Sequence, residues 1–195
     1  MIVLIDNGHG SNTPGKCSPD GRLREWKYCR EIAAAVELEL AVHGIESFRI
    51  VPESSDVPLK TRCQRVNAIC AEVGSSNVLL VSIHVNAASN GGWKNARGWT
   101  GWVYTKCRER SRLLAQCLYA AAEKRGLKGN RYVPACKYWT ANYYITKHTN
   151  CPAVLTENLF QDNREDVDFL LSASGKKAIV DLHVEGILNY IHQVE

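Results

Sequence analysis

Hydrophobic residues along the chain follow two kinds of spacing, which alternate from the N-terminus to the C-terminus. Residues 2–5 and 78–83 are continuous apolar runs rich in β-branched side chains, typical of buried strands. Between residues 24 and 43 apolar side chains recur about four apart, which predicts an amphipathic helix ended by Gly44. The other predicted elements are strands at 47–51, 102–105, 143–146 and 153–155, and helices at 59–74, 111–124 and 172–192. Gly126 is expected to end the helix at 111–124.

Because strands alternate with helices throughout, the sequence predicts the α/β fold class. We expect a mostly parallel, twisted central sheet of about six strands, with helices on both faces. The chain has 195 residues and contains no internal repeat and no linker long enough to divide it. Residues 1–195 are therefore expected to form a single domain.

Composition narrows the class of protein without changing this prediction. Hydrophobic residues make up 45% of the chain and charged residues 23%, which excludes a disordered or collagen-like chain. No apolar run approaches the ~20 residues of a transmembrane helix. The chain begins directly with a predicted strand, so we expect no signal peptide. Eight cysteines without a CxxC pair are expected to be free thiols, which argues against a cysteine-based zinc site.

Charge is concentrated in the middle of the chain. Residues 91–150 contain 12 Lys and Arg against 2 Asp and Glu, a net charge of +10, whereas residues 1–90 carry −1 and residues 151–195 carry −5. The same segment holds four of the five tryptophans and six of the eight tyrosines. Basic residues mixed with aromatics suit an anionic polymer, either nucleic acid or a charged cell-wall glycan. The alternative is a solvated basic surface over an aromatic core.

Reactive side chains follow three of the predicted strands. His9 comes after the first strand, His84 at the end of the strand at 78–83, and Glu157 after the strand at 153–155. Ligands in open α/β sheets bind beyond the carboxyl ends of the strands, where Glu25 at the start of the first helix is also expected. Two His and one Glu with an open position form a hydrolytic zinc site, and a further carboxylate can act as general base.

Each of these residues also has an ordinary structural interpretation. His9 is compatible with a hydrogen bond in a Gly-rich turn, Glu25 with a charge that favours the helix dipole, and His84 with a core histidine. Placing all of them at one sheet edge favours the site. His148, in a predicted turn, is a weaker candidate for substrate contact.

The chain resembles the zinc-dependent N-acetylmuramoyl-L-alanine amidases of the Amidase_3 group. The strand and turn ending in His9 and Gly10 resemble the family's opening motif, and the Ser-Ile-His-Val-Asn-Ala run around His84 resembles another of its signatures. The segments that carry the resemblance occur in the family's order, at 4–10, Glu25, 59–67, 82–87, 152–157 and 160–163.

The resemblance implies a role for each candidate residue. His9, Glu25 and His84 would bind one Zn²⁺ ion, and Glu157 would be the catalytic residue. The implied reaction is hydrolysis of the amide bond between N-acetylmuramic acid and L-alanine in peptidoglycan. Candidate substrate-binding residues are Asn86, Arg62, Trp99 and Trp102.

Two departures from the family pattern affect loop shape. Gly10 is followed by Ser11 where the family usually has a second glycine, and Leu159 stands where a glycine usually follows the catalytic Glu by two positions. These departures leave the implied metal ligands unchanged.

The implied partner is peptidoglycan, without nucleic acid, a transmembrane segment or a separate wall-binding domain. We expect synthesis in the cytoplasm and action at the bacterial cell wall, either by endolysin-like release or after removal of an export signal. Two other functions stay open. A different zinc hydrolase, such as a peptidase, would release amino acids from peptides, and a non-catalytic wall- or nucleic-acid-binding module would bind regardless of chelation.

Overall fold

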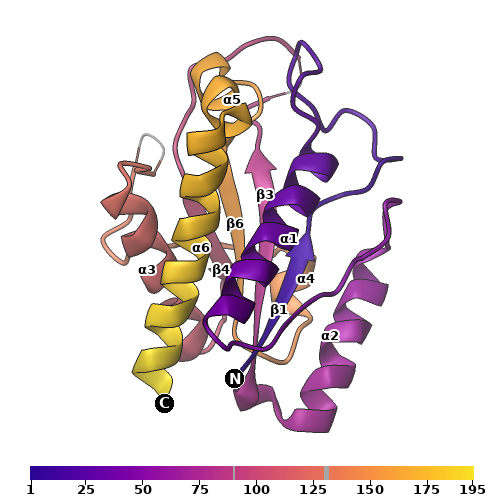
Figure 1. The fold of residues 1–195 in the computed structure, drawn as a ribbon, viewed down its shortest axis with the longest axis vertical. Coiled ribbons are helices and arrows are strands. Elements are labelled where there is room, and N and C mark those ends of the chain that lie inside the picture. Colours follow the sequence, from indigo (N-terminus) through magenta and orange to yellow (C-terminus); the bar gives the residue numbers. More distant parts are fainter. Residues whose placement is uncertain (90, 130–131) are drawn as a thin grey trace.

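A six-stranded sheet lies between two layers of helices in the computed structural model of the protein (Figure 1). The structure describes residues 1–89, 91–129 and 132–195. The strands are β1 (Ile2–Asn7), β2 (Ser47–Arg49), β3 (Val78–Asn86), β4 (Thr100–Tyr104), β5 (Trp139–Ala141) and β6 (Ala153–Phe160). The helices are α1 (Glu25–Val42), α2 (Leu59–Val73), the short 3₁₀ helix η1 (Ser75–Asn77), α3 (Glu109–Lys124), α4 (Tyr144–Lys147), α5 (Arg164–Leu171) and α6 (Ala173–Val194).

The sheet has the strand order β2-β1-β3-β6-β4-β5 and is mostly parallel, as predicted. Strands β1, β3 and β6 run parallel in its centre, so their carboxyl ends meet at the same edge. The exception is β4, which pairs antiparallel with β6 and parallel with β5. Consequently the C-terminal end of β4 lies at the opposite edge of the sheet, beside the start of β6.

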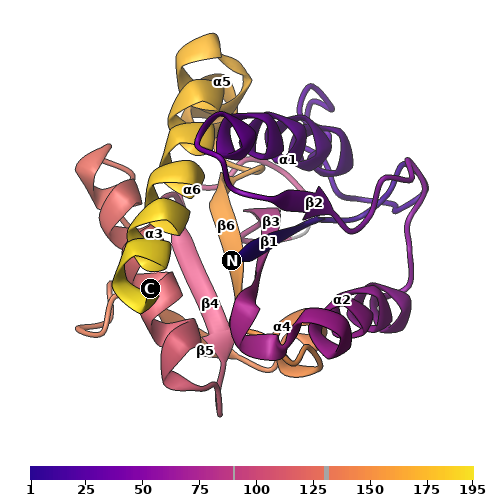
Figure 2. The same cartoon turned by 60° about the horizontal axis from the view of Figure 1, so that its bottom comes forward.

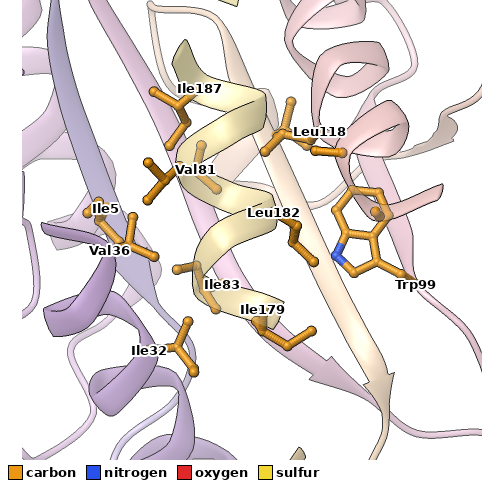
Figure 3. Packing of buried hydrophobic residues seen from close by; sticks show 14 of the residues in the cluster. Ile5, Ile32, Val36, Val81, Ile83, Trp99, Leu118, Ile179, Leu182 and Ile187 are labelled. Atoms are coloured by element: carbon orange, nitrogen blue, oxygen red, sulfur yellow. The ribbon is translucent and has the colours of Figure 1, made fainter. Parts of the chain in front are cut away.

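Each face of the sheet has its own hydrophobic core. Helices α1, α3 and α6 cover one face, and α2 and α4 cover the other (Figure 2). In the larger core, Ile179, Leu182 and Ile187 of α6 lie against Val81 and Ile83 of β3 (Figure 3). Alternation of side chains along the strands assigns each strand residue to one core. The odd-numbered residues of β3 before Asn86 belong to the larger core, and Leu80, Ser82 and His84 face α2 and α4.

The predicted stops of two helices are confirmed. After α1, Gly44 adopts φ 73°, its N–H donates to the carbonyl of Ala41, and the N–H of Ile45 donates to Leu40. This is a Schellman motif, in which a left-handed residue satisfies the last carbonyls of a helix. The same pair of hydrogen bonds follows α3, where Gly126 has φ 72°.

The structure corrects the predicted elements in the last third of the chain. The strand predicted at 143–146 is wrong, because these residues lie at helix α4, where Ile145 and Thr146 are buried. A short aromatic and apolar run does not distinguish a strand from one buried helical turn. The edge strand in this region is β5, which the prediction missed, as it missed α5. Strand β6 continues to Phe160 instead of ending at residue 155.

The cysteines agree with the expectation of free thiols. All eight cysteines are free, and five of them are buried: Cys29, Cys63, Cys70, Cys117 and Cys151. Among the described helices, none combines the length and the apolar character needed to cross a membrane.

Candidate metal centre

The turn after β1 holds His9 in a constrained position. Gly8 continues the strand by donating its N–H to the carbonyl of Ile83, and its Cα lies against the ring of His84. A Cβ at Gly8 would lie 2.6 Å from the His84 ring, so only glycine fits there. His9 itself adopts φ 59°, a left-handed conformation uncommon for a residue with a side chain. The turn thus brings two imidazoles from neighbouring strands together.

His9, Glu25 and His84 form one cluster of ligand atoms. The Glu25 carboxylate lies between the two rings, with Oε1 3.2 Å from His84 Nδ1 and Oε2 3.4 Å from His9 Nε2. The two imidazoles meet edge to face, with ring centroids 5.1 Å apart. One ligand atom from each residue lies within 4.8 Å of the others. Two nitrogens and one carboxylate oxygen are a donor set suited to catalytic Zn²⁺, so the residues present fit the ion.

The electrostatics of this cluster favour a charged carboxylate. Burial would raise the pKa of Glu25, but hydrogen bonds from His84 and His9 outweigh it and lower the pKa to about 2. Burial lowers the pKa of His84, and the adjacent Glu25 reverses this effect, so that the net shift is upward. The backbone N–H of Val85 also donates to Glu25 Oε1 at 3.0 Å. Glu25 is therefore held as an anion between the two imidazole rings. A metal cation can take the place of the protons on these rings.

Glu157 lies beside this cluster, on the next strand. It is paired in register with His84 across β3 and β6, so both side chains project from the same face of the sheet. Its Oε2 is buried and has no hydrogen-bond partner among the described residues. Burial raises its pKa to about 7, with the charges of His84 and Lys16 opposing the shift and that of Glu25 adding to it. Such a carboxyl group can accept and return a proton near neutral pH.

A pocket of about 320 Å³ connects these residues to the surface. Tyr143 and Tyr144, at the start of α4, form one wall, and Lys16 from the loop after β1 contributes a positive charge. The other lining residues are His9, His84, Glu157, Asp56, Val57, Leu59, Arg62, Ile145 and Leu155. The site is therefore a small, partly apolar cleft with one lysine above a buried carboxyl group.

Arg62 has a different position from the predicted one. It was expected to bind substrate, but its side chain is only 2% exposed. Its five N–H bonds are used internally, two of them to Asp6 and Asp56 at 2.8 and 2.7 Å. The remaining three go to the carbonyls of Asn7, His9 and Val57. Arg62 therefore holds the turn that carries His9 and has no donor left for a substrate.

The predicted substrate contact of Trp99 does not fit its location. The indole is fully buried in the larger core beside Leu118 and Leu182 (Figure 3), and its N–H donates to Asn158. A sugar cannot stack on a ring that is covered on both faces. At Trp99 the basic, aromatic segment therefore contributes to the core, as the alternative of a solvated basic surface over an aromatic core predicted.

Trp102 and Asn86 lie closer to the site. Trp102 is half-buried and its ring meets that of Tyr143 at 5.7 Å, so it supports a wall of the pocket from behind. Asn86 ends β3, where its side-chain oxygen accepts from the N–H of Ala87. His148 is exposed and stacks on Tyr144 at 4.2 Å.

Lys16, Tyr143 and Tyr144 line the pocket, and none of the three was predicted as a site residue. Lys16 lies in a Gly- and Pro-rich loop without periodicity, so no pattern marked it. Tyr143 and Tyr144 were assigned to a strand, although two adjacent tyrosines in a basic segment were a signal for a binding surface.

The chain matches known proteins in sequence over almost its whole length. Residues 3–189 match the Amidase_3 family, described as N-acetylmuramoyl-L-alanine amidase. The chain is 27% identical over 199 residues to an endolysin of Bacillus phage SPP1, covering 98% of this chain and 66% of that protein. It is 25% identical over 191 residues to the N-acetylmuramoyl-L-alanine amidase CwlM of Bacillus licheniformis, covering 95% of this chain and 66% of that protein. The chain thus spans slightly less than two thirds of the length of these relatives.

Solved structures share the fold over almost the whole chain. An N-acetylmuramoyl-L-alanine amidase from Clostridium difficile 630 superposes with a TM-score of 0.83 at 25% identity, covering 98% of this chain and 96% of that one. The amidase Ami1 from Mycobacterium smegmatis superposes with a TM-score of 0.85 at 17% identity, covering 99% and 97% of the two chains. At 17% identity, the likeness to Ami1 shows a shared fold alone.

Proposed function

Since the chain belongs to the Amidase_3 family of N-acetylmuramoyl-L-alanine amidases, we propose that it is a zinc-dependent peptidoglycan amidase. The proposed reaction is hydrolysis of the amide bond between N-acetylmuramic acid and the L-alanine of the stem peptide. Residues 1–195 act as the catalytic domain, and the place of action is the bacterial cell wall, as for an endolysin.

One observation carries the proposal. One ligand atom each from His9, Glu25 and His84 lies within 4.8 Å of the others. The carboxyl group of Glu157, whose Oε2 has no hydrogen-bond partner among the described residues, lines the same pocket as the two histidines. The three residues would hold one Zn²⁺ ion by two nitrogens and one oxygen, leaving a position for substrate and water. A zinc ion, when bound, supplies Lewis acidity toward the scissile carbonyl and toward water.

Glu157 is the proposed proton carrier. Its Oε2 accepts a proton from the attacking water and returns it to the nitrogen of the departing L-alanine. Burial raises the pKa of this carboxyl group to about 7, which suits both directions of transfer near neutral pH. The positive charge of a bound metal ion acts in the opposite direction on this pKa.

The pocket also accounts for the class of substrate. Stem peptides carry free carboxylates, and Lys16 lines the pocket with a positive charge that acts on Glu157. Tyr143 and Tyr144 offer ring faces to the sugar or peptide, and Trp102 supports Tyr143 from behind. Asn86, at the end of β3, is the remaining candidate for a polar contact with substrate.

The test is digestion of purified peptidoglycan, with products identified by mass spectrometry. The proposal predicts stem peptides with a free L-alanine amino group and intact glycan strands, and no product after chelation. Glu157→Gln is expected to lower the rate by about 10²–10⁴-fold while the bound zinc stays the same, because proton transfer is lost and the ligands are kept.

Glu72→Gln, on the exposed side of α2, is the matched control and should keep the wild-type rate. Full activity of Glu157→Gln would remove this residue from the mechanism. Cleavage within the stem peptide instead of at its N-terminus would make the protein a peptidase, and wall binding without any cleavage would make it a binding module.

A further inference from the structure

A second pocket of about 540 Å³ lies away from the candidate metal centre. Its walls come from the end of β4, the segment that leads into α3 and the first turn of that helix, from η1, and from the end of α4 with the loop that precedes β6. Because β4 and β6 are antiparallel, the end of β4 and the start of β6 meet at one edge of the sheet. Glu157 lies four residues further along β6, ~13 Å away at the usual rise of a strand. The pocket is therefore separate from the site already described.

The lining of this pocket is strongly positive. It includes four exposed basic side chains, Lys106, Arg108, Arg110 and Lys147, and a single acidic one, Glu109. Within the described part of the chain, none of the four basic residues belongs to an ion pair. Like charges gathered around one hollow repel each other, so their arrangement favours an anionic occupant.

The floor of the pocket offers further hydrogen-bond donors. Ser111 is 6% exposed, and its oxygen accepts from the N–H of Ala153 at 3.1 Å, which leaves the hydroxyl proton available. The guanidinium of Arg110 is held at the rim by a hydrogen bond to the carbonyl of Ser76 at 3.1 Å. Helix α3 begins here with no side-chain cap, so the positive end of its dipole adds to the charge.

We propose that this pocket binds the phosphodiester groups of an anionic polymer. Its volume lies within the range of ligand pockets, about 300–1,000 Å³. Guanidinium groups bind phosphate through two parallel N–H bonds, and lysines add point charges. The source of the phosphates is a cell-wall polymer of the poly(glycerol phosphate) type, and this choice of source rests on the proposed function. The inference that the pocket binds phosphate groups is independent of the proposed function.

The lining favours such a polymer over nucleic acid. Proteins that bind single-stranded nucleic acid stack bases on aromatic side chains beside the basic groove. Among the lining residues only Tyr104 is aromatic, and it is half-buried. None of the tryptophans of the basic segment lines this pocket, and Trp99 is in the core while Trp102 packs against Trp139 and Tyr143. A polymer without bases matches this surface.

Titration calorimetry with a synthetic oligo(glycerol phosphate) tests the proposal. The protein carries Glu157→Gln in all samples, so that binding is measured independently of any hydrolysis. We expect binding that weakens as salt rises, and a loss of about tenfold or more in affinity in the double variant Arg108→Ala/Lys147→Ala. The matched control, Lys124→Ala/Lys128→Ala, removes two exposed cations at the far end of α3 and should bind normally.

Each other outcome contradicts the proposal in a defined way. Equal losses in both double variants would mean that diffuse surface charge, and not the pocket, binds the polymer. Equal affinity for a single-stranded DNA oligomer of the same charge, lost in the pocket variant, would overturn the choice of polymer. Binding of inorganic phosphate without binding of the oligomer would reduce the site to a phosphate site. The pocket variant without Glu157→Gln should still digest purified peptidoglycan, so failure here and failure of the proposed amidase activity are distinguishable.

Discussion

Arg62 shows how the surroundings of a single side chain decide its role. In the sequence it belongs to a helix motif resembling that of a family of enzymes, and substrate binding was a reasonable prediction. In the structure it is buried beside Asp6 and uses its five N–H bonds on the chain itself. One of them reaches the carbonyl of His9, at 3.4 Å. Arg62 is therefore a positioning residue for the proposed metal ligand.

Replacing Arg62 is expected mainly to lower the free energy of unfolding. Metal binding should weaken as a secondary effect, because Arg62 also holds the turn that carries His9. Arg62→Ala leaves the buried carboxylate of Asp6 without its partner, which we expect to lower the free energy of unfolding by about 3–5 kcal/mol. Urea denaturation measures this. The control Arg65→Ala removes a half-exposed ion pair with Glu53 and should cost about 1 kcal/mol or less. A similar small cost for Arg62→Ala would contradict the assigned role.

His183 is a second residue whose role depends on burial. It is fully buried in α6, with Nδ1 2.7 Å from the carbonyl of Ile179 and Nε2 3.0 Å from the hydroxyl of Thr156. Burial lowers its pKa from 6.5 to about 4. It is thus a neutral core histidine, with no part in the proposed metal centre.

The low pKa of His183 predicts an acid-sensitive fold. The unfolded chain takes up this proton near pH 6.5 and the folded chain only near pH 4, so stability falls as the pH drops through that window. The contribution is about 3 kcal/mol, present above pH 6.5 and lost as the pH falls toward 4. Urea denaturation across this range should show a shallower pH dependence for His183→Gln than for wild type. The exposed His43→Gln is the control, and identical slopes in all three proteins would refute the prediction.

At the scale of elements, the site depends on strands that continue through polar residues. The sequence prediction ended β6 at residue 155 because Thr156, Glu157 and Asn158 are polar. In the structure they stay in the strand, since Thr156 bonds to His183 and Asn158 bonds to Trp99 and to the carbonyl of His84. Of these three polar residues, Thr156 and Asn158 thus have partners from distant segments, which no local pattern reveals. Glu157 is the exception whose Oε2 has none among the described residues.

The turn after β1 makes a prediction about metal affinity. In Gly8→Ala the new methyl group would lie 2.6 Å from the His84 ring and push it out of the cluster. We expect zinc affinity to fall by about 10- to 100-fold, the usual effect of disturbing a ligand's support, with activity falling in parallel. Competition with a chromogenic chelator measures this affinity.

Gly15→Ala is the matched control in the same loop, because no atom lies within 4 Å of its Cβ position and only its φ of 71° is strained. It should bind zinc as the wild type does. Unchanged zinc affinity in Gly8→Ala would mean that the contact between Gly8 and the His84 ring does not position this ligand.

For the whole molecule, the proposed metal centre connects three elements that are distant in the chain. His9 follows β1, Glu25 begins α1 and His84 lies in β3. An ion held by all three stabilises the folded state and has no such site in the unfolded chain. At a free zinc concentration about 1,000 times the dissociation constant, the gain is about 4 kcal/mol.

This gain should appear as a rise in Tm of roughly 10 °C when the chelated protein receives zinc. Glu25→Gln is expected to lose most of the rise, because the neutral side chain no longer supplies the charged ligand between the two rings. His192→Ala, which removes an exposed histidine near the C-terminus, should keep it. A Tm that does not respond to zinc in the wild type would argue against the centre.

The sequence by itself determined the class of fold, the two glycine helix stops and the residues of the proposed metal centre. The fold class and the helix stops are written locally, because hydrophobic periodicity and glycine positions report the burial and conformation of neighbouring residues. The residues of the proposed metal centre were instead inferred from their positions after predicted strands and from the family resemblance. Tertiary structure alone decided that Arg62 and Trp99 are internal, that residues 144–147 form a helix and that β4 reverses direction. It also decided the raised pKa of Glu157 and the gathering of four basic residues in one pocket. Desolvation and contacts between distant segments depend on which surfaces meet, and no stretch of sequence contains that information.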